Sequence, residues 1–225
     1  MARLLLLNGF MATGKSSVGR VLAERTDARF VDLDARIETE TGSSIRSLFQ
    51  ERGEAGFRSL ETEILDELLS HPGDRPLVVS LGGGALLDRA RRVELLFRAT
   101  IVTLTASAEE IARRVAEQDG ASGARPLLGG QDPVERTRFL LEQRAAAYAE
   151  CHASVATDDR SLDEIVDEIL ILLDRDPVPV AAGLASYSVD VGHGVVEARL
   201  PGLLGKPSGQ LLVTDTTVGP LHGGA

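Results

Sequence analysis

The chain has 225 residues, 43% of them hydrophobic and 26% charged, a composition typical of one globular domain with an extension. Its formal net charge of −10 argues against nucleic acid as the main partner, because a phosphate backbone requires a basic surface. No apolar run approaches the roughly 20 residues of a membrane-spanning helix, and the single Cys151 excludes a disulfide framework and a cysteine-based zinc site. We therefore expect a cytoplasmic protein that binds neither nucleic acid nor membranes.

Apolar strands alternate with helices through residues 3–173. The apolar run at 3–8 meets Asn8-Gly9 without a cleavage-like stretch, so we interpret it as a buried strand and not as a signal peptide. The elements that follow are predicted, in chain order, as a helix at 16–25, a strand at 29–31, a helical region at 35–69 broken near Gly42 and Gly53, a strand at 77–80, a helix at 88–97, a strand at 100–105, a helix at 108–116, a loop at 118–131, a helix at 133–150, a strand at 154–156 and a helix at 162–173 capped by Ser161. This alternation predicts an α/β domain with a parallel sheet of about five strands flanked by helices.

The composition changes after Asp174. Residues 175–186 contain the run Pro177-Val178-Pro179 and are predicted as a linker. Residues 187–191 and 210–214 read as strands of an incomplete unit at 187–225, because two strands without a core cannot form a stable domain. The expected organisation is thus a domain at 1–174, a linker and a C-terminal extension.

The segment Gly9–Ser16, GFMATGKS, fits the phosphate-binding pattern G-x-x-x-x-G-K-[ST] and lies between a predicted strand and a predicted helix. In such a loop backbone N–H groups surround an anion, and the helix N-terminus adds partial positive charge. Lys15 is expected to reach the β- and γ-phosphates of ATP, and Ser16 to ligate Mg²⁺. The remaining nucleotide-binding positions of the loop are Ala12, Thr13, Gly14 and Ser17.

Lysine is scarce in this chain. Of the 24 basic residues only Lys15 and Lys206 are lysines, and the other 22 are arginines. Lysine and arginine are not interchangeable in a phosphate-binding loop. The alternative, a Gly-rich turn with an exposed lysine, is therefore disfavoured, and the pattern predicts a protein that binds a nucleoside triphosphate. A P-loop alone does not name the reaction.

Two aspartates, Asp32 and Asp34, follow the second predicted strand, which we expect beside the first. Ligands of open α/β sheets bind at the carboxyl ends of the strands. The two carboxylates point to the same side if the strand continues through them. One could support Mg²⁺ through water and the other could accept a proton from an attacking hydroxyl. The alternative for Asp34 is a solvated N-cap of the following helix.

Further motifs follow in order along the chain. They are Ile37-Glu38, Ser44-Ile45 with Leu48-Phe49, Gly53-Glu54 with Phe57-Arg58 and Glu61, the triple glycine Gly82-Gly83-Gly84, the segment Arg125-Pro126-Leu127-Leu128, and Arg144 four residues before Tyr148. Together with the loop at 9–16 and the aspartate pair, this ordered set resembles the shikimate kinase family over about residues 3–173.

The resemblance implies ATP-dependent phosphorylation of the 3-hydroxyl of shikimate, a step of chorismate and aromatic amino acid biosynthesis, with ATP and Mg²⁺ as cofactors and a monomeric kinase domain. It implies that Asp34 holds substrate hydroxyls and acts as the base, and that Lys15 and Arg125 are further catalytic residues. Arg125 would close over the phosphates as part of a lid that excludes water. Ser16 and Asp32 would serve the metal.

The resemblance also implies a substrate site. Arg58 and Arg144 would grip the shikimate carboxylate, a role that suits planar guanidinium groups. Gly82, Gly83 and Gly84 would bring backbone N–H groups close to the ring hydroxyls. Candidates to stack on adenine are Arg113, Arg114 and Arg160, and Arg160 is the one that we assign to the nucleotide site; surface charge is an equally good interpretation of each.

Each of these residues also has a plainer interpretation. Arg58 could pair with Glu54 or Glu61 on its own helix, Arg144 could be a solvated helix charge, and the triple glycine could be a flexible connection. The alternative functions are another small-molecule P-loop kinase, gluconate kinase-like, and a nucleotide-binding module without catalysis. The second is suggested by Ala12, which occupies a position where the family usually has glycine.

Residues 187–194 and 211–221 resemble the opening of 3-dehydroquinate synthase, through Tyr187-Ser188-Val189-Asp190-Val191-Gly192 and Leu212-Val213-Thr214-Asp215-Thr216-Thr217-Val218. This second resemblance implies a kinase–synthase fusion. The alternative is an unrelated tail, and His193 and His222 are not assigned to a metal.

Overall fold

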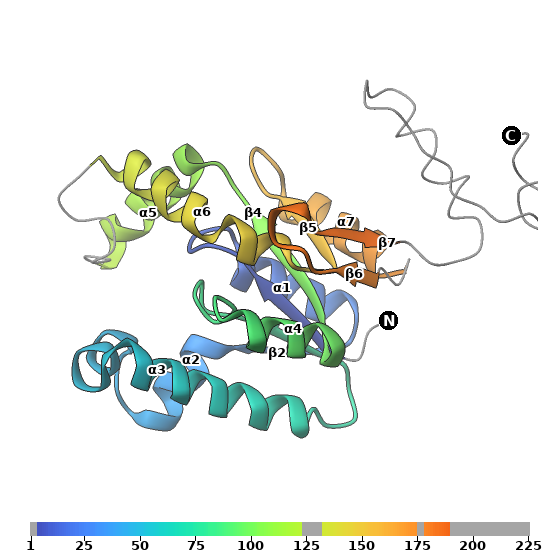
Figure 1. Ribbon diagram of the computed structural model, residues 1–225, viewed down its shortest axis with the longest axis horizontal. Coiled ribbons are helices and arrows are strands. Elements are labelled where there is room, and N and C mark those ends of the chain that lie inside the picture. Colours follow the sequence, from blue (N-terminus) through green and yellow to red (C-terminus); the bar gives the residue numbers. More distant parts are fainter. Residues whose placement is uncertain (1–3, 123–131, 175–177, 190–225) are drawn as a thin grey trace, which may run out of the picture. The chain divides into compact units, whose positions relative to one another are not determined.

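The computed structural model describes residues 4–122, 132–174 and 178–189 of the chain (Figure 1). Its main sheet has five parallel strands in the order β2-β3-β1-β4-β5. The strands are β1 (Leu4–Asn8), β2 (Arg29–Asp32), β3 (Leu77–Ser80), β4 (Thr100–Thr105) and β5 (Ala153–Ala156). The predicted α/β fold with a five-stranded parallel sheet is confirmed.

The position of β2 in the sheet differs from the expected one. It pairs with β3, in the register Asp32 to Ser80, and β3 lies between it and β1. The burial of the strands gives the reason. All four residues of β3 are buried, whereas β2 is at most partly buried along its length and takes the edge of the sheet.

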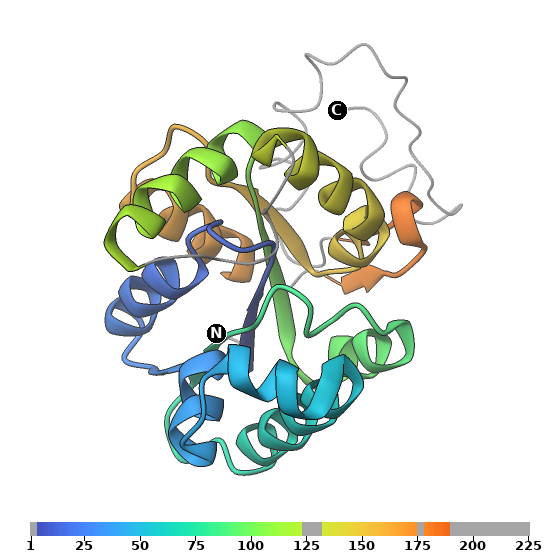
Figure 2. The same ribbon diagram turned by 90° about the vertical axis from the view of Figure 1, so that its left-hand side faces the viewer.

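Helices cover both faces of the sheet. Within the described residues they are α1 (Lys15–Arg25), α2 (Leu33–Thr41), α3 (Ile45–Ser70), α4 (Arg89–Arg98), α5 (Ala108–Ser122), α6 (Pro133–Ala149) and α7 (Leu162–Asp174). Figure 2 shows α2 with α3 on one side of the sheet's end and α5 with α6 on the other. The core has one apolar cluster between the sheet and α2, α3 and α4, and another between the sheet and α1 and α7.

Local sequence explains where most helices begin and end. Gly42 ends α2 in the left-handed conformation with φ 67°, and Gly53, with φ 66°, kinks α3 at the predicted break. The predicted cap of α7 is confirmed, because Ser161 Oγ accepts from the Glu164 N–H at 3.3 Å and donates to its carboxylate at 2.7 Å. The loop predicted at 118–131 begins too early, since α5 continues to Ser122.

The range predicted as a linker contains regular structure. Strand β6 (Val178–Val180) pairs antiparallel with β7 (Tyr187–Val189), and the 3-10 helix η2 (Gly183–Ala185) lies between them and contacts α6. The Gly183 N–H donates to Glu150 Oε1 at 2.9 Å. These elements belong to the same compact unit as the sheet.

Residues 190–225 lie outside the described residues, with the strand predicted at 210–214, Lys206 and most of the second resemblance. None of the helices in the described ranges is long and apolar enough to cross a membrane.

Candidate active site

A cavity of about 420 Å³ opens at the carboxyl ends of β1, β2 and β3. Residues from the loops after all three strands line it, as expected for a ligand site in an open parallel sheet. The predicted site residues in its lining are Ala12, Gly14, Lys15, Ser16, Ser17, Asp32, Asp34, Arg58, Gly82, Gly83, Gly84 and Arg144. The structure thus brings together most of the residues that the sequence singles out.

The phosphate-binding loop is shaped by close backbone contacts. A Cβ on Gly9, which has φ 131°, would lie 2.2 Å from the carbonyl oxygen of Leu104, so only glycine fits there. Lys15 is buried, and its Nζ donates to the carbonyl oxygens of Gly9 at 2.9 Å and Phe10 at 2.7 Å. These bonds hold the lysine against the backbone of the loop, and the residue lines the cavity.

The hydroxyl of Ser16 links the loop to the ends of two strands. It donates to Asp32 Oδ2 at 2.5 Å and lies 3.3 Å from the hydroxyl of Ser80. Hydroxyl and carboxylate oxygens are the ligands that Mg²⁺ accepts while keeping several waters. The donor set at Ser16 and Asp32 therefore fits the metal that the sequence predicts there, although no group of three or more His, Cys, Asp or Glu side chains gathers as a metal cluster in the ranges that the structure describes.

Asp34 lies in the first turn of α2 and not on a continued strand. The N-cap of α2 is Asp32, whose Oδ1 accepts from the Ala35 N–H at 3.3 Å, so the alternative of Asp34 as the cap is wrong. Burial, and then the neighbouring Asp32 carboxylate, raise the pKa of Asp34 above its ordinary value of 3.8, against the opposing charges of Lys15 and Arg58. A carboxylate with a raised pKa beside two cations has the properties of a general base.

Arg58 is held in the cavity wall by its own helix. Its Nη1 donates to Glu61 Oε2 at 2.6 Å, and its guanidinium lies 5.2 Å from the ring centroid of Phe57. The predicted pairing with Glu61 is therefore present, together with a looser contact of 3.8 Å to Glu54. The pairing does not remove Arg58 from the site, because the guanidinium still lines the cavity.

Arg144 approaches the same cavity from α6. Its Nη1 donates to the carbonyl oxygen of Gly83 at 3.2 Å, and the hydroxyl of Tyr148 donates to the same oxygen at 2.7 Å. The guanidinium lies 5.3 Å from the ring centroid of Phe10. The triple glycine is thus fixed by α6, which argues against a merely flexible connection.

Some predicted residues lie elsewhere. The buried Thr13 turns its hydroxyl to the carbonyl oxygen of Phe10, at 2.8 Å, and does not line the cavity. Arg160 donates to the carbonyl oxygens of Ala156 and Glu164 at 3.1 and 3.0 Å and also stays outside it. Arg125 lies outside the described residues. The assignment of Arg125 and Arg160 to the nucleotide site remains a prediction.

The sequence analysis gave no role in the site to Glu61 and Ser80, which line the cavity, or to Tyr148, which does not line it but contacts a residue that does. Glu61 is 3% exposed and orients Arg58, Ser80 contacts Ser16, and Tyr148 anchors Gly83. The three-residue spacing of Arg58 and Glu61 could have indicated the first of these roles. The other two depend on the pairing of strands and on the packing of α6, which no local pattern reveals.

A phosphate-binding loop, a half-buried aspartate and two arginines around one cavity define a P-loop phosphotransferase for a small acidic acceptor. Residues 11–174 match the family described as shikimate kinase. A shikimate kinase of Thermus thermophilus is 44% identical over 169 residues, covering 75% of this chain and 89% of the relative, and that of Geobacter metallireducens is 40% identical over 167 residues, covering 74% and 89%. The chain belongs to the shikimate kinase family.

Solved structures agree with this assignment. The shikimate kinase from Acinetobacter baumannii, solved in complex with shikimate, has a TM-score of 0.68 at 34% identity, covering 77% of this chain and 93% of that chain.

Proposed function

We propose that this protein transfers the γ-phosphoryl group of ATP to the 3-hydroxyl of shikimate. The observation that carries the proposal is the shared cavity: Lys15 on the donor side and Asp34 with Arg58 and Arg144 on the acceptor side line one continuous space. Family membership supports the choice of shikimate, which is the ligand in the complex of the related Acinetobacter enzyme.

The acceptor is held by charge and by shape. Arg58 reaches the cavity from α3, beside Gly84, and Arg144 reaches it from α6, on the Gly83 carbonyl oxygen. The two guanidinium groups bind the acceptor carboxylate between them. Glycine at positions 82 and 84 lets polar side chains approach the main chain, since a Cβ there would lie 3.0 Å from Asp34 Oδ1 and 2.2 Å from Arg58 Nη2, respectively. The ring hydroxyls bind beside this backbone in our proposal. This clamp places the reacting hydroxyl beside Asp34, which provides the proximity that phosphoryl transfer requires.

Asp34 accepts the proton of the attacking hydroxyl as the new P–O bond forms. The charges of Lys15 and Arg58 favour the ionised form of Asp34, which is the form that accepts a proton. On the donor side, Lys15 and the N–H groups of the loop neutralise the charge that builds on the transferring phosphoryl group. The hydroxyl of Ser16 and the carboxylate of Asp32 are the residues that would hold Mg²⁺.

Bound Mg²⁺ would supply a Lewis acid at the β- and γ-phosphate oxygens. Arg125, in the segment Arg125-Pro126-Leu127-Leu128, closes over the phosphates and excludes water in this proposal. We propose, as the sequence analysis expects, that the kinase domain is a monomer.

The experiment is a substrate panel. The protein is incubated with Mg-ATP and, in separate reactions, with shikimate, quinate, gluconate and a nucleoside monophosphate, and ADP release is measured with a coupled assay. The proposal predicts ADP release with shikimate and formation of a shikimate monophosphate, identified by mass spectrometry. Turnover with gluconate or a nucleotide and none with shikimate would support another P-loop kinase. Binding of ATP with no turnover on any acceptor would support a module without catalysis.

A further inference from the structure

Ala12 carries a strained backbone in the middle of the phosphate-binding loop. It has φ 58°, in the left-handed region that residues with a Cβ avoid because of a steric penalty. Glycine would adopt this conformation without that penalty. The alanine methyl packs instead against the apolar cluster of Phe10, Ile111 and Val115. Something outside the loop must therefore stabilise the left-handed turn.

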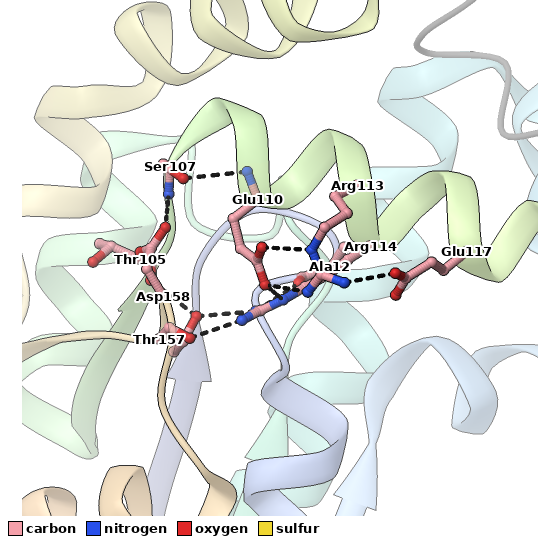
Figure 3. Close-up of polar contacts among 9 residues, drawn as sticks. All are labelled: Ala12, Thr105, Ser107, Glu110, Arg113, Arg114, Glu117, Thr157 and Asp158. Atoms are coloured by element: carbon pink, nitrogen blue, oxygen red, sulfur yellow. Dashed lines mark hydrogen bonds and ion pairs between the residues drawn. The ribbon is translucent and has the colours of Figure 1, made fainter.

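Arg114, on α5, is the side chain that contacts this turn. Its Nη1 donates to the carbonyl oxygen of Ala12 at 3.2 Å, across 102 positions of sequence, as the close-up of this cluster shows (Figure 3). The same guanidinium donates to the carbonyl oxygen of Thr157 at 2.7 Å and to the Thr157 hydroxyl at 3.1 Å. One planar group thus joins the phosphate-binding loop to the loop after β5.

Both anchors of Arg114 are themselves fixed. Thr157 binds the end of β4, since its N–H and its hydroxyl donate to the carbonyl oxygen of Thr105 at 2.8 and 3.1 Å. Glu110 accepts from Arg114 Nε at 2.6 Å, and hydrogen bonds from Arg113 and Arg114 lower its pKa to about 2, so it is charged at neutral pH. The side chain of Arg114 is 20% exposed, and three groups determine its orientation.

We propose that Arg114 is a positioning residue for phosphate binding: it holds Ala12 in its left-handed conformation, so that the N–H groups of the loop are arranged for a triphosphate before the nucleotide arrives. This inference rests on the proposed function only in taking a triphosphate as the ligand of the loop. It differs from a contact with the adenine base, because the guanidinium acts through the carbonyl oxygen of Ala12.

The test compares two ligands that differ in the base. Arg114→Met keeps the length of the side chain and removes its donors. Calorimetry on the full chain measures the dissociation constants of Mg-ATP and of Mg-tripolyphosphate, which has no base. We expect both to rise by about tenfold, the effect of losing one hydrogen bond to a charged group. A lysine at position 114 can reach one carbonyl oxygen but cannot bridge two. The dissociation constants of Arg114→Lys should therefore lie between those of Arg114→Met and those of the wild type.

The control is Arg138→Met. Arg138 is an exposed arginine of α6 that pairs with Glu109 and is 51% exposed. Within the part of the chain that the structure describes, this arginine makes no hydrogen bond or ion pair with the phosphate-binding loop. Both dissociation constants should therefore stay within about twofold of the wild-type values, as for most surface substitutions. Thermal melts establish that each variant is folded at the temperature of the titration.

A second comparison addresses the strain directly. Glycine at position 12 adopts the left-handed conformation without a steric penalty, so the turn no longer depends on Arg114. In an Ala12→Gly background, Arg114→Met should therefore weaken tripolyphosphate binding less than it does in the wild type. Loss of ATP affinity with unchanged tripolyphosphate affinity would overturn the proposal in favour of a base contact. Unchanged affinity for both ligands, or an equal loss with alanine and with glycine at position 12, would also overturn it. If the substrate panel showed no turnover with shikimate, the proposed function would be wrong, but the effect of Arg114 on triphosphate binding would still hold.

Discussion

Ser16 and Asp32 are joined by a hydrogen bond of 2.5 Å, although Ser16 lies in the first turn of α1 and Asp32 ends β2 at the edge of the sheet. The bond spans the position of β3, whose last residue, Ser80, lies 3.3 Å from the Ser16 hydroxyl. Three chain segments therefore meet at the place where the metal is proposed to bind.

Asp32→Asn should raise the Mg²⁺ concentration needed for half-maximal activity several-fold, because an amide has lost the charge that favours a divalent cation. Asparagine is as good an N-cap as aspartate, so the helix α2 should keep its stability. Activity is measured against Mg²⁺ at fixed ATP. Asp32→Ala is the companion variant and should lose about 1 kcal/mol of stability as well, through loss of the cap. An Mg²⁺ dependence identical to wild type in both variants would remove Asp32 from the metal site.

Gly84→Ala should weaken shikimate binding without harming nucleotide binding. A Cβ at position 84 would lie 2.2 Å from Arg58 Nη2 and 2.8 Å from Arg58 Cζ, so the guanidinium must move. The obstacle is the end of a flexible side chain, and the protein should therefore stay folded. We expect the KM for shikimate to rise by about tenfold, the effect of one displaced hydrogen bond to a charged group, with the KM for ATP unchanged. In an Arg58→Ala background the same substitution should have little further effect; an equal effect in both backgrounds would contradict this explanation.

Asp34→Asn should make the folded protein more stable at neutral pH. Burial and the Asp32 carboxylate raise the pKa of Asp34 in the folded state, so the folded protein binds this proton more tightly than the unfolded chain. The stabilising contribution of the protonated form is complete below the ordinary pKa of 3.8 and is lost as pH rises through the raised pKa. The variant should thus melt at a higher temperature than wild type at pH 7, and the difference should shrink as the pH is lowered. Thermal melting followed by circular dichroism measures the melting temperatures of the variant and the wild type at each pH. A melting temperature of the variant below that of the wild type at pH 7 would contradict the prediction.

Glu150→Ala should destabilise the fold strongly. Glu150 is fully buried and accepts from Arg92 Nε at 2.8 Å, from Arg89 Nε at 3.1 Å and from the Gly183 N–H. Burial acts to raise its pKa, but these hydrogen bonds prevail and lower it. The substitution leaves Arg92, 4% exposed, as an uncompensated buried charge, at a cost of about 3–5 kcal/mol in the free energy of unfolding.

Chemical denaturation measures this loss. The matched control is Glu142→Ala, an exposed glutamate on α6, which should change stability by no more than about 0.5 kcal/mol. If the Glu150 and Glu142 variants were equally stable, the buried cluster would not hold η2 against α6.

The fold was predictable from the sequence to the extent that each element has a local cause. The apolar run of β1, the pattern at 9–16 and the breaks at Gly42 and Gly53 depend only on neighbouring residues. The structure has a strand, a loop, a helix end and a helix kink at these places, respectively. The edge position of β2 depends on which strand buries more apolar surface, a comparison between segments 48 residues apart at Asp32 and Ser80.

The residues of the candidate site likewise fall into two groups, those that short motifs predict and those whose contacts depend on the packing of distant segments. Lys15, Asp34 and Arg58 lie within short motifs, and all three line the cavity as expected. The contact of Arg114 with Ala12 was not predictable, because it depends on how α5 packs beside the phosphate-binding loop. The buried Glu150 cluster likewise joins α4, α6 and η2, and the range containing η2 resembles a linker in sequence because proline and alanine runs have no hydrophobic periodicity.

The most direct test of the account is the turnover of Asp34→Asn with saturating shikimate and Mg-ATP, measured beside the affinity of the same variant for ATP. We predict that turnover falls by about 10²–10⁴-fold, the usual contribution of a general base, while the dissociation constant for ATP stays close to that of wild type. A variant that keeps more than about a tenth of the wild-type rate would contradict the assignment of Asp34 as the base, and with it the proposed chemistry of the cavity.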